Sequence, residues 1–175
     1  MTLLVLLMGL RPAEACQLRP EDIITKDGVL CARVTDKGAY MRVKSPHAVR
    51  DVPIHDFLKK LGFVGWMQTA SQTHLYHAMP QREVDWSKPY LLRFGHTLSA
   101  LGFPPGARPT AYGLRHTFID VLKQNDINEA TVADIVGHSV PSLTYGRYGK
   151  RTPLTQMQTA INSMTLPSGG AYACV

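Results

Sequence analysis

The sequence contains few cysteines and few charged residues, and it has no hydrophobic stretch long enough to cross a membrane. Its three cysteines, Cys16, Cys31 and Cys174, are irregularly spaced and form no Cys-x-x-Cys pair. This spacing argues against a disulfide framework and a zinc site, and it fits a protein of the reducing cytoplasm. The apolar runs stop short of the roughly 18 residues that a membrane span requires. We therefore expect neither a disulfide-rich secreted protein nor a membrane protein.

What the sequence does contain is enough apolar material for one packed domain, and an excess of positive charge. Of its 175 residues, 45% are hydrophobic, so we expect a single folded domain and no extensive disorder. Lysines and arginines number 19 against 13 aspartates and glutamates, which gives a net charge of +6. A basic domain of this size favours an anionic partner, of which nucleic acid is the commonest.

The first residues resemble a signal peptide but do not meet its physical requirements. Residues 1–10 are apolar, and Cys16 follows a short segment with two alanines, as in a lipoprotein signal. However, no basic residue precedes the apolar stretch, and Arg11, Pro12 and Glu14 stand where a cleavage site is small and neutral. Apolar residues cover most of the circumference, which predicts a buried first helix. No capping residue precedes it, so we expect the sequence to begin inside a structural element.

Hydrophobic periodicity and turn residues predict a mainly α fold with a small three-stranded antiparallel sheet (α+β). Residues 30–34 and 40–43 flank the turn segment 36–38 and predict a hairpin, while residues 49–54 predict an edge strand. Residues 65–84 are interpreted as a loop with one strand. After the first helix, the predicted helices span residues 56–61, 91–101, 111–124, 129–136, 142–148 and 154–164. We expect one domain over residues 1–165 and a flexible tail over residues 166–175.

Two arginines, a histidine and a tyrosine follow one another along the chain in a distinctive order, each with characteristic neighbours. Arg11 follows a Gly-Leu pair and precedes Glu14 by three positions. Arg115 lies in the segment 113–118 on a predicted helix. His138 follows a glycine, and Tyr148 comes ten residues later. Together these residues resemble the catalytic domain of the tyrosine recombinase (phage integrase) family, from the start of the chain to about residue 150.

The resemblance implies a site for phosphoryl transfer on DNA. Arg11 and Arg115 would clamp the non-bridging oxygens of a phosphodiester, because guanidinium groups bind such oxygens bidentately and stay charged. Tyr148 would attack the phosphorus, form a covalent 3′-phosphotyrosyl bond and free a 5′-hydroxyl. Lys44 would protonate the leaving 5′-oxygen as the general acid. Since the covalent link keeps the bond energy, we expect no metal and no cofactor.

The resemblance also implies supporting roles. His138 would hydrogen-bond the phosphate, Glu14 would orient Arg11, and His116 would act structurally or through its neighbours. Tyr112 stands where the family has a histidine, three residues before the second arginine. A tyrosine can hydrogen-bond a phosphate, but with a pKa near 10 it is a poor base at neutral pH.

The residue types alone leave alternatives open. Tyr145 competes with Tyr148 as the nucleophile, and Lys37 and Arg50 compete with Lys44 as the basic residue near the sheet. Taken without the pattern, Arg11 would be interpreted as a surface residue paired with Glu14 three positions on. His138 would be interpreted as a helix cap. Tyr112 has the alternative interpretation of an aromatic residue in the core.

We therefore expect a site-specific recombinase or integrase catalytic domain that cuts and rejoins double-stranded DNA, for integration or excision of a mobile element. It would act in the cytoplasm and self-associate on paired DNA sites, and the sequence after Lys150 is a candidate for docking onto a neighbour. Family members usually carry a helical core-binding domain ahead of the catalytic domain, which we do not find here. The alternatives are a truncated, inactive DNA-binding remnant and a type IB topoisomerase-like relaxing enzyme.

Overall fold

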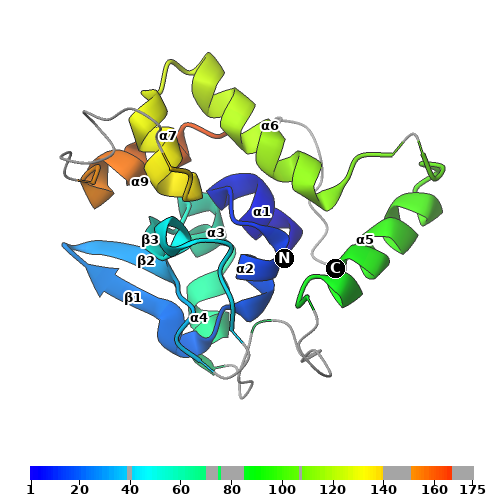
Figure 1. Cartoon of the computed structure of the whole chain (residues 1–175), viewed down its shortest axis with the longest axis horizontal. Helices are drawn as coiled ribbons and strands as arrows, with labels where there is room; N and C mark the ends of the chain where they lie inside the picture. Colours follow the sequence, from blue (N-terminus) through cyan, green and yellow to red (C-terminus); the bar gives the residue numbers. More distant parts are fainter. Residues whose placement is uncertain (39–40, 70–74, 76–84, 107, 140–150, 167–175) are drawn as a thin grey trace.

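Helices form most of the structure and surround a central first helix, with a small sheet on one side (Figure 1). This computed structural model describes residues 1–38, 41–69, 75, 85–106, 108–139 and 151–166. The predicted α+β class, mainly helical with three antiparallel strands, is confirmed. The helices are α1 (Thr2–Met8), α2 (Pro12–Gln17), α3 (Asp56–Lys60), α4 (Phe63–Thr69), α5 (Lys88–Ala100), α6 (Ala111–Gln124), α7 (Glu129–Val136) and α9 (Leu154–Asn162).

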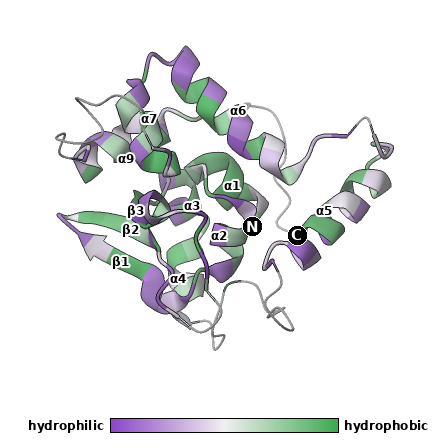
Figure 2. Ribbon diagram, viewed as in Figure 1, coloured by the Kyte–Doolittle hydropathy of each residue, from purple (hydrophilic) through white to green (hydrophobic). Residues whose placement is uncertain are grey.

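Helix α1 forms the centre of the core and is mostly hydrophobic along its length (Figure 2). It packs against α6, whose Phe118 is fully buried. The helix ends at Gly9, where φ is 62° and a Cβ atom would lie 2.5 Å from the Phe118 ring. Only glycine fits this turn, which leads directly to Arg11. The predicted buried first helix is confirmed by its buried residues, Leu4, Val5, Leu7 and Met8.

The sheet has the order β1 (Ile23–Lys26), β2 (Val29–Val34) and β3 (Arg50–Pro53), with both pairings antiparallel. The predicted strand over residues 40–43 is wrong, because residues 41–43 form no strand. The hairpin turn is Asp27-Gly28 instead. Positive φ angles of 50° and 75° at these two residues give the mirror-image turn that matches strand twist. Strand β2 then pairs with β3, and residues 35–49 form the long connection that carries Lys44.

Most predicted helices are confirmed within a few residues, and capping side chains account for their starts. Thr110 accepts a hydrogen bond from Gly113 N at the start of α6, and Asn128 accepts one from Ala130 N at the start of α7. The loop expected from residue 65 is wrong as far as Thr69, because α4 occupies these residues and buries Met67. The predicted helix over residues 142–148 lies outside the described residues, as does the predicted tail except for Leu166.

Helix α9 packs into the core formed by the rest of the chain. Met157, Ala160 and Ile161 are buried, and α9 packs against β3 and α7. Its end is tied to the start of α3, where Asn162 and Asp56 exchange two hydrogen bonds of 2.9 and 3.0 Å. Among the described residues, no helix is both long enough and apolar enough to cross a bilayer.

Candidate active site

The buried carboxylate of Glu14 is the centre of a cluster of arginines. Its side chain is 2% exposed and accepts two hydrogen bonds from Arg50, of 3.0 and 3.2 Å. Arg11, the capping residue just before α2, donates to it from its main-chain N (2.9 Å) and from Nη1 (2.6 Å). Arg115 Nη1 lies 4.0 Å from the same carboxylate. Three guanidinium groups therefore surround one carboxylate, which leaves an excess of positive charge.

The C-terminal end of α7 brings the same three arginines together. The last carbonyls of a helix have no partner within it and carry the negative end of the helix dipole. Three successive carbonyls at this end each accept a hydrogen bond from a different arginine: Ile135 O from Arg50 (2.6 Å), Val136 O from Arg115 (2.7 Å) and Gly137 O from Arg11 (3.3 Å). A helix end that would otherwise need water is thus satisfied by the arginine cluster.

Arg115 also joins α1 and His138 to the cluster. It donates to Gly9 O through Nη1 and to His138 Nε2 through Nη2, the latter at 3.1 Å. A guanidinium group can only donate, so His138 Nε2 accepts and its ring proton lies on Nδ1. Burial lowers the pKa of Arg115 to about 9, and the positive charges of Arg11 and Arg50 act in the same direction. The group still carries its charge at neutral pH.

His138 lies at the surface directly after α7. Burial lowers the pKa of its ring, and the charges of Arg115, Arg11, Arg50 and Lys44 lower it further, in that order. Because its ordinary pKa is already near 6.5, the ring is neutral at pH 7. Neutral His138 is oriented by Arg115 and faces the same excess of positive charge. Its position at the helix end agrees with both the capping and the phosphate-binding interpretations.

The structure brings four predicted residues together and leaves others aside. Arg11, Glu14, Arg115 and His138 form one connected network. Lys44 is exposed on the long β2–β3 connection, near enough for its charge to affect the pKa of His138. The alternative cations separate clearly: Lys37 is exposed, whereas Arg50 is buried with its donors bound inside the cluster.

Tyr112 and His116 lie on α6 with Arg115, and both are exposed. Tyr112 is 43% exposed, so the interpretation as a core aromatic is wrong. Its pKa is raised by burial and by Asp85, while Arg11 opposes the shift, which puts its hydroxyl near the arginine cluster. His116 makes no hydrogen bond or ion pair within the described part of the chain.

The two candidate nucleophiles, Tyr145 and Tyr148, lie outside the described residues.

Arg50 is the residue whose importance the sequence reasoning missed. Its side chain is 2% exposed, and it connects Glu14, the end of α7 and Ala48 O (2.7 Å). Gly137, with φ at 70°, makes room for it, because a Cβ atom there would lie 2.9 Å from Arg50 Nη1. The available signal was an arginine inside a predicted strand, where an apolar side chain is expected. Such an arginine needs a buried carboxylate as its partner, and only the folded chain shows that Glu14 lies beside it.

Residues 1–38, 41–69, 75, 85–106, 108–139 and 151–166 include no group of three or more histidines, cysteines, aspartates or glutamates able to hold a metal ion. The cysteines described here, Cys16 and Cys31, are free and buried. Burial raises their pKa to about 12 and about 11, so both are protonated at neutral pH. The chemistry that this cluster offers is anion binding by arginines.

Residues 1–153 of the chain match the phage integrase family. Among curated proteins, the chain is 28% identical over 136 residues to the tyrosine recombinase XerA of Thermococcus onnurineus (strain NA1). That match covers 78% of this chain and 45% of the relative. The chain thus spans less than half the length of this curated relative.

Two solved structures share the fold. The integrase from mycobacterium phage Brujita is 21% identical with a TM-score of 0.63, and the match covers 94% of this chain and 50% of that one. The XerH site-specific recombinase bound to its difH substrate, in a pre-cleavage complex, is 21% identical with a TM-score of 0.53. Here the match covers 83% of this chain and 40% of that one.

Proposed function

The chain belongs to the phage integrase family, and on that premise we propose that it is the catalytic domain of a site-specific DNA recombinase. It cuts and rejoins double-stranded DNA through a covalent link to Tyr148, for integration or excision of a mobile element. Several copies act together on paired DNA sites, as exchange between two duplexes requires. The observation that carries this proposal is the cluster of Arg11, Arg50 and Arg115 around a single carboxylate.

The charge of the cluster supports a phosphodiester as its ligand. Three guanidinium groups and one carboxylate leave two positive charges in a mostly buried setting, where an anion is bound far more strongly than in water. Counting only partners in the described part of the chain, Arg115 uses three of its five N–H groups in hydrogen bonds, and Arg11 uses two of its five. The remaining N–H groups are available to the two non-bridging oxygens of a phosphate.

Each residue contributes one part of the proposed reaction. The phenol of Tyr148 loses its proton to solvent as its oxygen bonds to phosphorus, and the P–O5′ bond breaks. Lys44 gives a proton to the departing 5′-oxygen, which leaves as a hydroxyl. Arg11, Arg115 and neutral His138 stabilise the charge that develops on the phosphate oxygens. Glu14 and Arg50 hold the arginines in place and touch no substrate.

Covalent capture of DNA tests this proposal. The protein is incubated at low ionic strength, which favours phosphate contacts, with a pool of double-stranded oligonucleotides of randomised sequence, each nicked in one strand. Cleavage near the nick releases a short fragment that diffuses away, so rejoining fails. We expect a protein–DNA adduct that survives denaturing electrophoresis, and sequencing of the trapped DNA gives the preferred site.

Two other outcomes of this experiment identify the alternatives. DNA that is retained under native conditions but lost on denaturation contradicts the proposal and indicates an inactive DNA-binding remnant. Relaxation of supercoiled plasmid without strand exchange between two copies of the trapped site indicates a type IB topoisomerase-like enzyme, which shares the same covalent chemistry.

The Tyr112 hydroxyl is expected to donate a hydrogen bond to the phosphate. Its raised pKa keeps it protonated at neutral pH, and it shares a face of α6 with Arg115. Tyr112→Phe should lower the rate of adduct formation about tenfold, the range for one hydrogen bond to a charged group. Tyr112→His should retain or raise the rate near pH 7, because an imidazole both donates and titrates there.

Cleavage rates and melting temperatures of the two Tyr112 variants are measured side by side. Since the parent side chain is 43% exposed, we expect little change in melting temperature for either. A Tyr112→Phe variant that cleaves as fast as the parent means that the hydroxyl takes no part in the reaction.

A further inference from the structure

A buried glutamine at the end of α2 binds the segment that carries Lys44. Gln17 is 4% exposed. Its Oε1 accepts a hydrogen bond from Arg42 N (2.7 Å), and its Nε2 donates to Arg42 O (3.2 Å) and to Ala13 O (3.0 Å). One side-chain amide therefore binds both main-chain polar groups of Arg42, two residues before Lys44.

The chemistry of the contacts fixes the orientation of this amide. A main-chain N–H can only donate, so the atom facing Arg42 N is the oxygen, and the two carbonyls face the nitrogen. Both amide hydrogens and the amide oxygen are thus in use. Residues 41–43 form no strand, and Gln17 supplies to Arg42 the pair of hydrogen bonds that a neighbouring strand would give.

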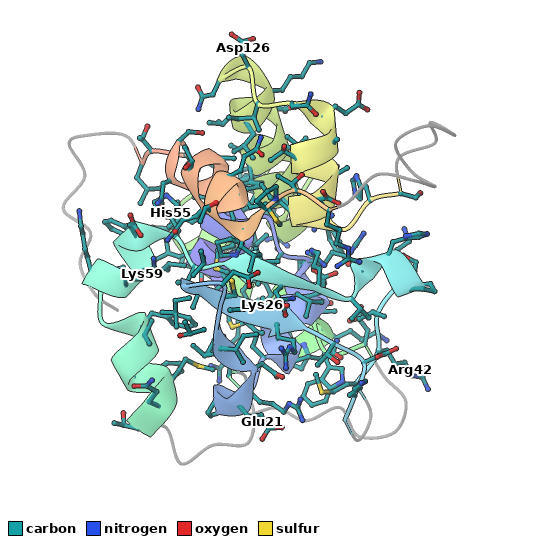
Figure 3. The ribbon with its side chains drawn as sticks, turned by 90° about the vertical axis from the view of Figure 1, so that its left-hand side faces the viewer. Glu21, Lys26, Arg42, His55, Lys59 and Asp126 are labelled. Carbon is teal, nitrogen blue, oxygen red and sulfur yellow. The ribbon has the colours of Figure 1, made fainter. Side chains whose placement is uncertain are left out.

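The lysine segment is held at a second point beyond Lys44. Ala48 O accepts a hydrogen bond of 2.7 Å from Arg50, within the arginine cluster. Lys44 itself is exposed, and so is the side chain of Arg42, which lies at the periphery of the molecule (Figure 3). The two anchors hold the main chain on either side of Lys44 and leave its side chain free to reach DNA.

Both anchors belong to the network that holds the arginines. Glu14 and Gln17 lie three residues apart on one side of α2, and Arg11 is the capping residue just before this helix. Glu14 binds Arg50, which binds Ala48, while Gln17 binds Arg42 directly. The position of the lysine segment is therefore fixed relative to Arg11 by the same short helix.

We propose that Gln17 is a positioning residue that places Lys44 for proton donation to the leaving 5′-oxygen. This inference rests on the proposed function. In that step the P–O5′ bond breaks while the Lys44 ammonium transfers one proton to the oxygen, so the ammonium must lie within hydrogen-bond reach of it. A displacement of about 1 Å can lower such a rate as much as 10²-fold. Gln17 acts through the main chain and does not touch DNA.

The test compares two leaving groups on the duplex recovered by covalent capture. One substrate is natural, and the other has sulfur in place of the bridging 5′-oxygen at the cleaved phosphate. A thiol has a pKa near 8.5 and leaves as a thiolate without a proton, so sulfur removes the need for the general acid. We expect Gln17→Leu to cleave the natural substrate about 10- to 100-fold more slowly, and the sulfur substrate within about threefold of the parent rate.

Two further variants make the result specific. Gln17→Glu keeps the size and the acceptor but loses both donors, so it should show the same pattern and replaces Gln17→Leu if that variant does not fold. Gln68→Leu, an exposed glutamine on α4, should leave both rates unchanged. Equal loss on the two substrates overturns the proposal, because it means general damage to the site.

The same assay separates this inference from the function on which it rests. A parent protein that forms no adduct with either substrate contradicts the proposed function. If Lys44→Ala is not rescued by sulfur, then Lys44 is not the general acid and the role of Gln17 fails with it. Rescue of Lys44→Ala together with no rescue of either Gln17 variant overturns the positioning role alone.

Discussion

Replacing Tyr148 with phenylalanine is expected to reduce covalent DNA adducts below detection, while non-covalent DNA binding stays within about threefold of the parent. The hydroxyl oxygen is the atom that bonds to phosphorus, so its removal leaves no nucleophile. Non-covalent affinity comes mainly from phosphate contacts by arginine and lysine, which the variant retains. Adducts are measured by denaturing electrophoresis and binding by a native gel-shift titration on the same nicked duplex.

The matched control for this variant is Tyr145→Phe, three residues earlier in the same segment. It should form adducts at close to the parent rate, since Tyr148 has the spacing from His138 that resembles the family. If Tyr145→Phe is the inactive variant and Tyr148→Phe the active one, the assignment of the nucleophile is wrong while the proposed chemistry stands.

Replacing Glu14 with glutamine is expected to lower the free energy of unfolding by about 3–5 kcal/mol, the usual range for breaking a buried ion pair from one side. The substitution preserves size but leaves Arg50 and Arg11, both bonded to this carboxylate, without their counter-charge. Arg115, at 4.0 Å, loses the same compensation. Urea titration at pH 7 measures the change. Adduct formation should fall as well, because the arginine cluster loses its geometry.

Asp51→Asn serves as the control for the Glu14 variant. Asp51 pairs with Lys26 and Arg33, but those partners are 52% and 47% exposed. Exposed pairs of this kind contribute about 0–1 kcal/mol, so the variant should stay close to the parent. Equal and small losses for both variants would contradict the central place given to the Glu14 carboxylate.

The pH dependence of stability follows from the same carboxylate. Burial by itself raises the pKa of Glu14, but the charge and hydrogen bonds of Arg50, with those of Arg11, outweigh it and lower the pKa below its ordinary 4.5. A carboxylate with a lowered pKa stabilises the fold above its unfolded pKa, and this stabilisation is lost as pH falls through the folded value. The parent should therefore lose more stability on acidification below pH 4.5 than Glu14→Gln, which has no carboxylate to titrate at this position.

The sequence predicted which residues gather around Glu14 better than it predicted which residues hold them there. Arg11, Arg115 and His138 could be picked out because their types and spacing follow a motif that the chemistry requires. Arg50 and Gln17 could not, because each acts by binding main-chain groups that only the folded chain brings near. A glutamine that replaces a strand partner leaves no periodic signal, and an arginine buried in a strand is recognised only when its carboxylate is known.

The fold shows the same division between local and tertiary signals. Capping by Thr110 and Asn128 is local, and the helices that follow them begin where the sequence predicts. The sequence prediction placed the hairpin turn at residues 36–38, although Asp27-Gly28 is also a turn sequence and lies only a few residues earlier. The Asp27-Gly28 turn prevails because its positive φ angles let β2 turn back on β1, and the pairing of β2 with β3 spans a longer connection. Choosing between such turns needs the strand partner, which is tertiary information.

The three carbonyls at the end of α7 also tie the arginine cluster to the order in which the chain is made and folds. Their arginine partners lie 21, 85 and 126 positions away along the chain. During synthesis, α7 leaves the ribosome after all three arginines, and contacts over such separations form late because long loops must close first. An incompletely folded chain therefore contains all three arginines, but they have not yet come together as a cluster. Any anion binding by the arginine cluster is therefore tied to the completion of folding.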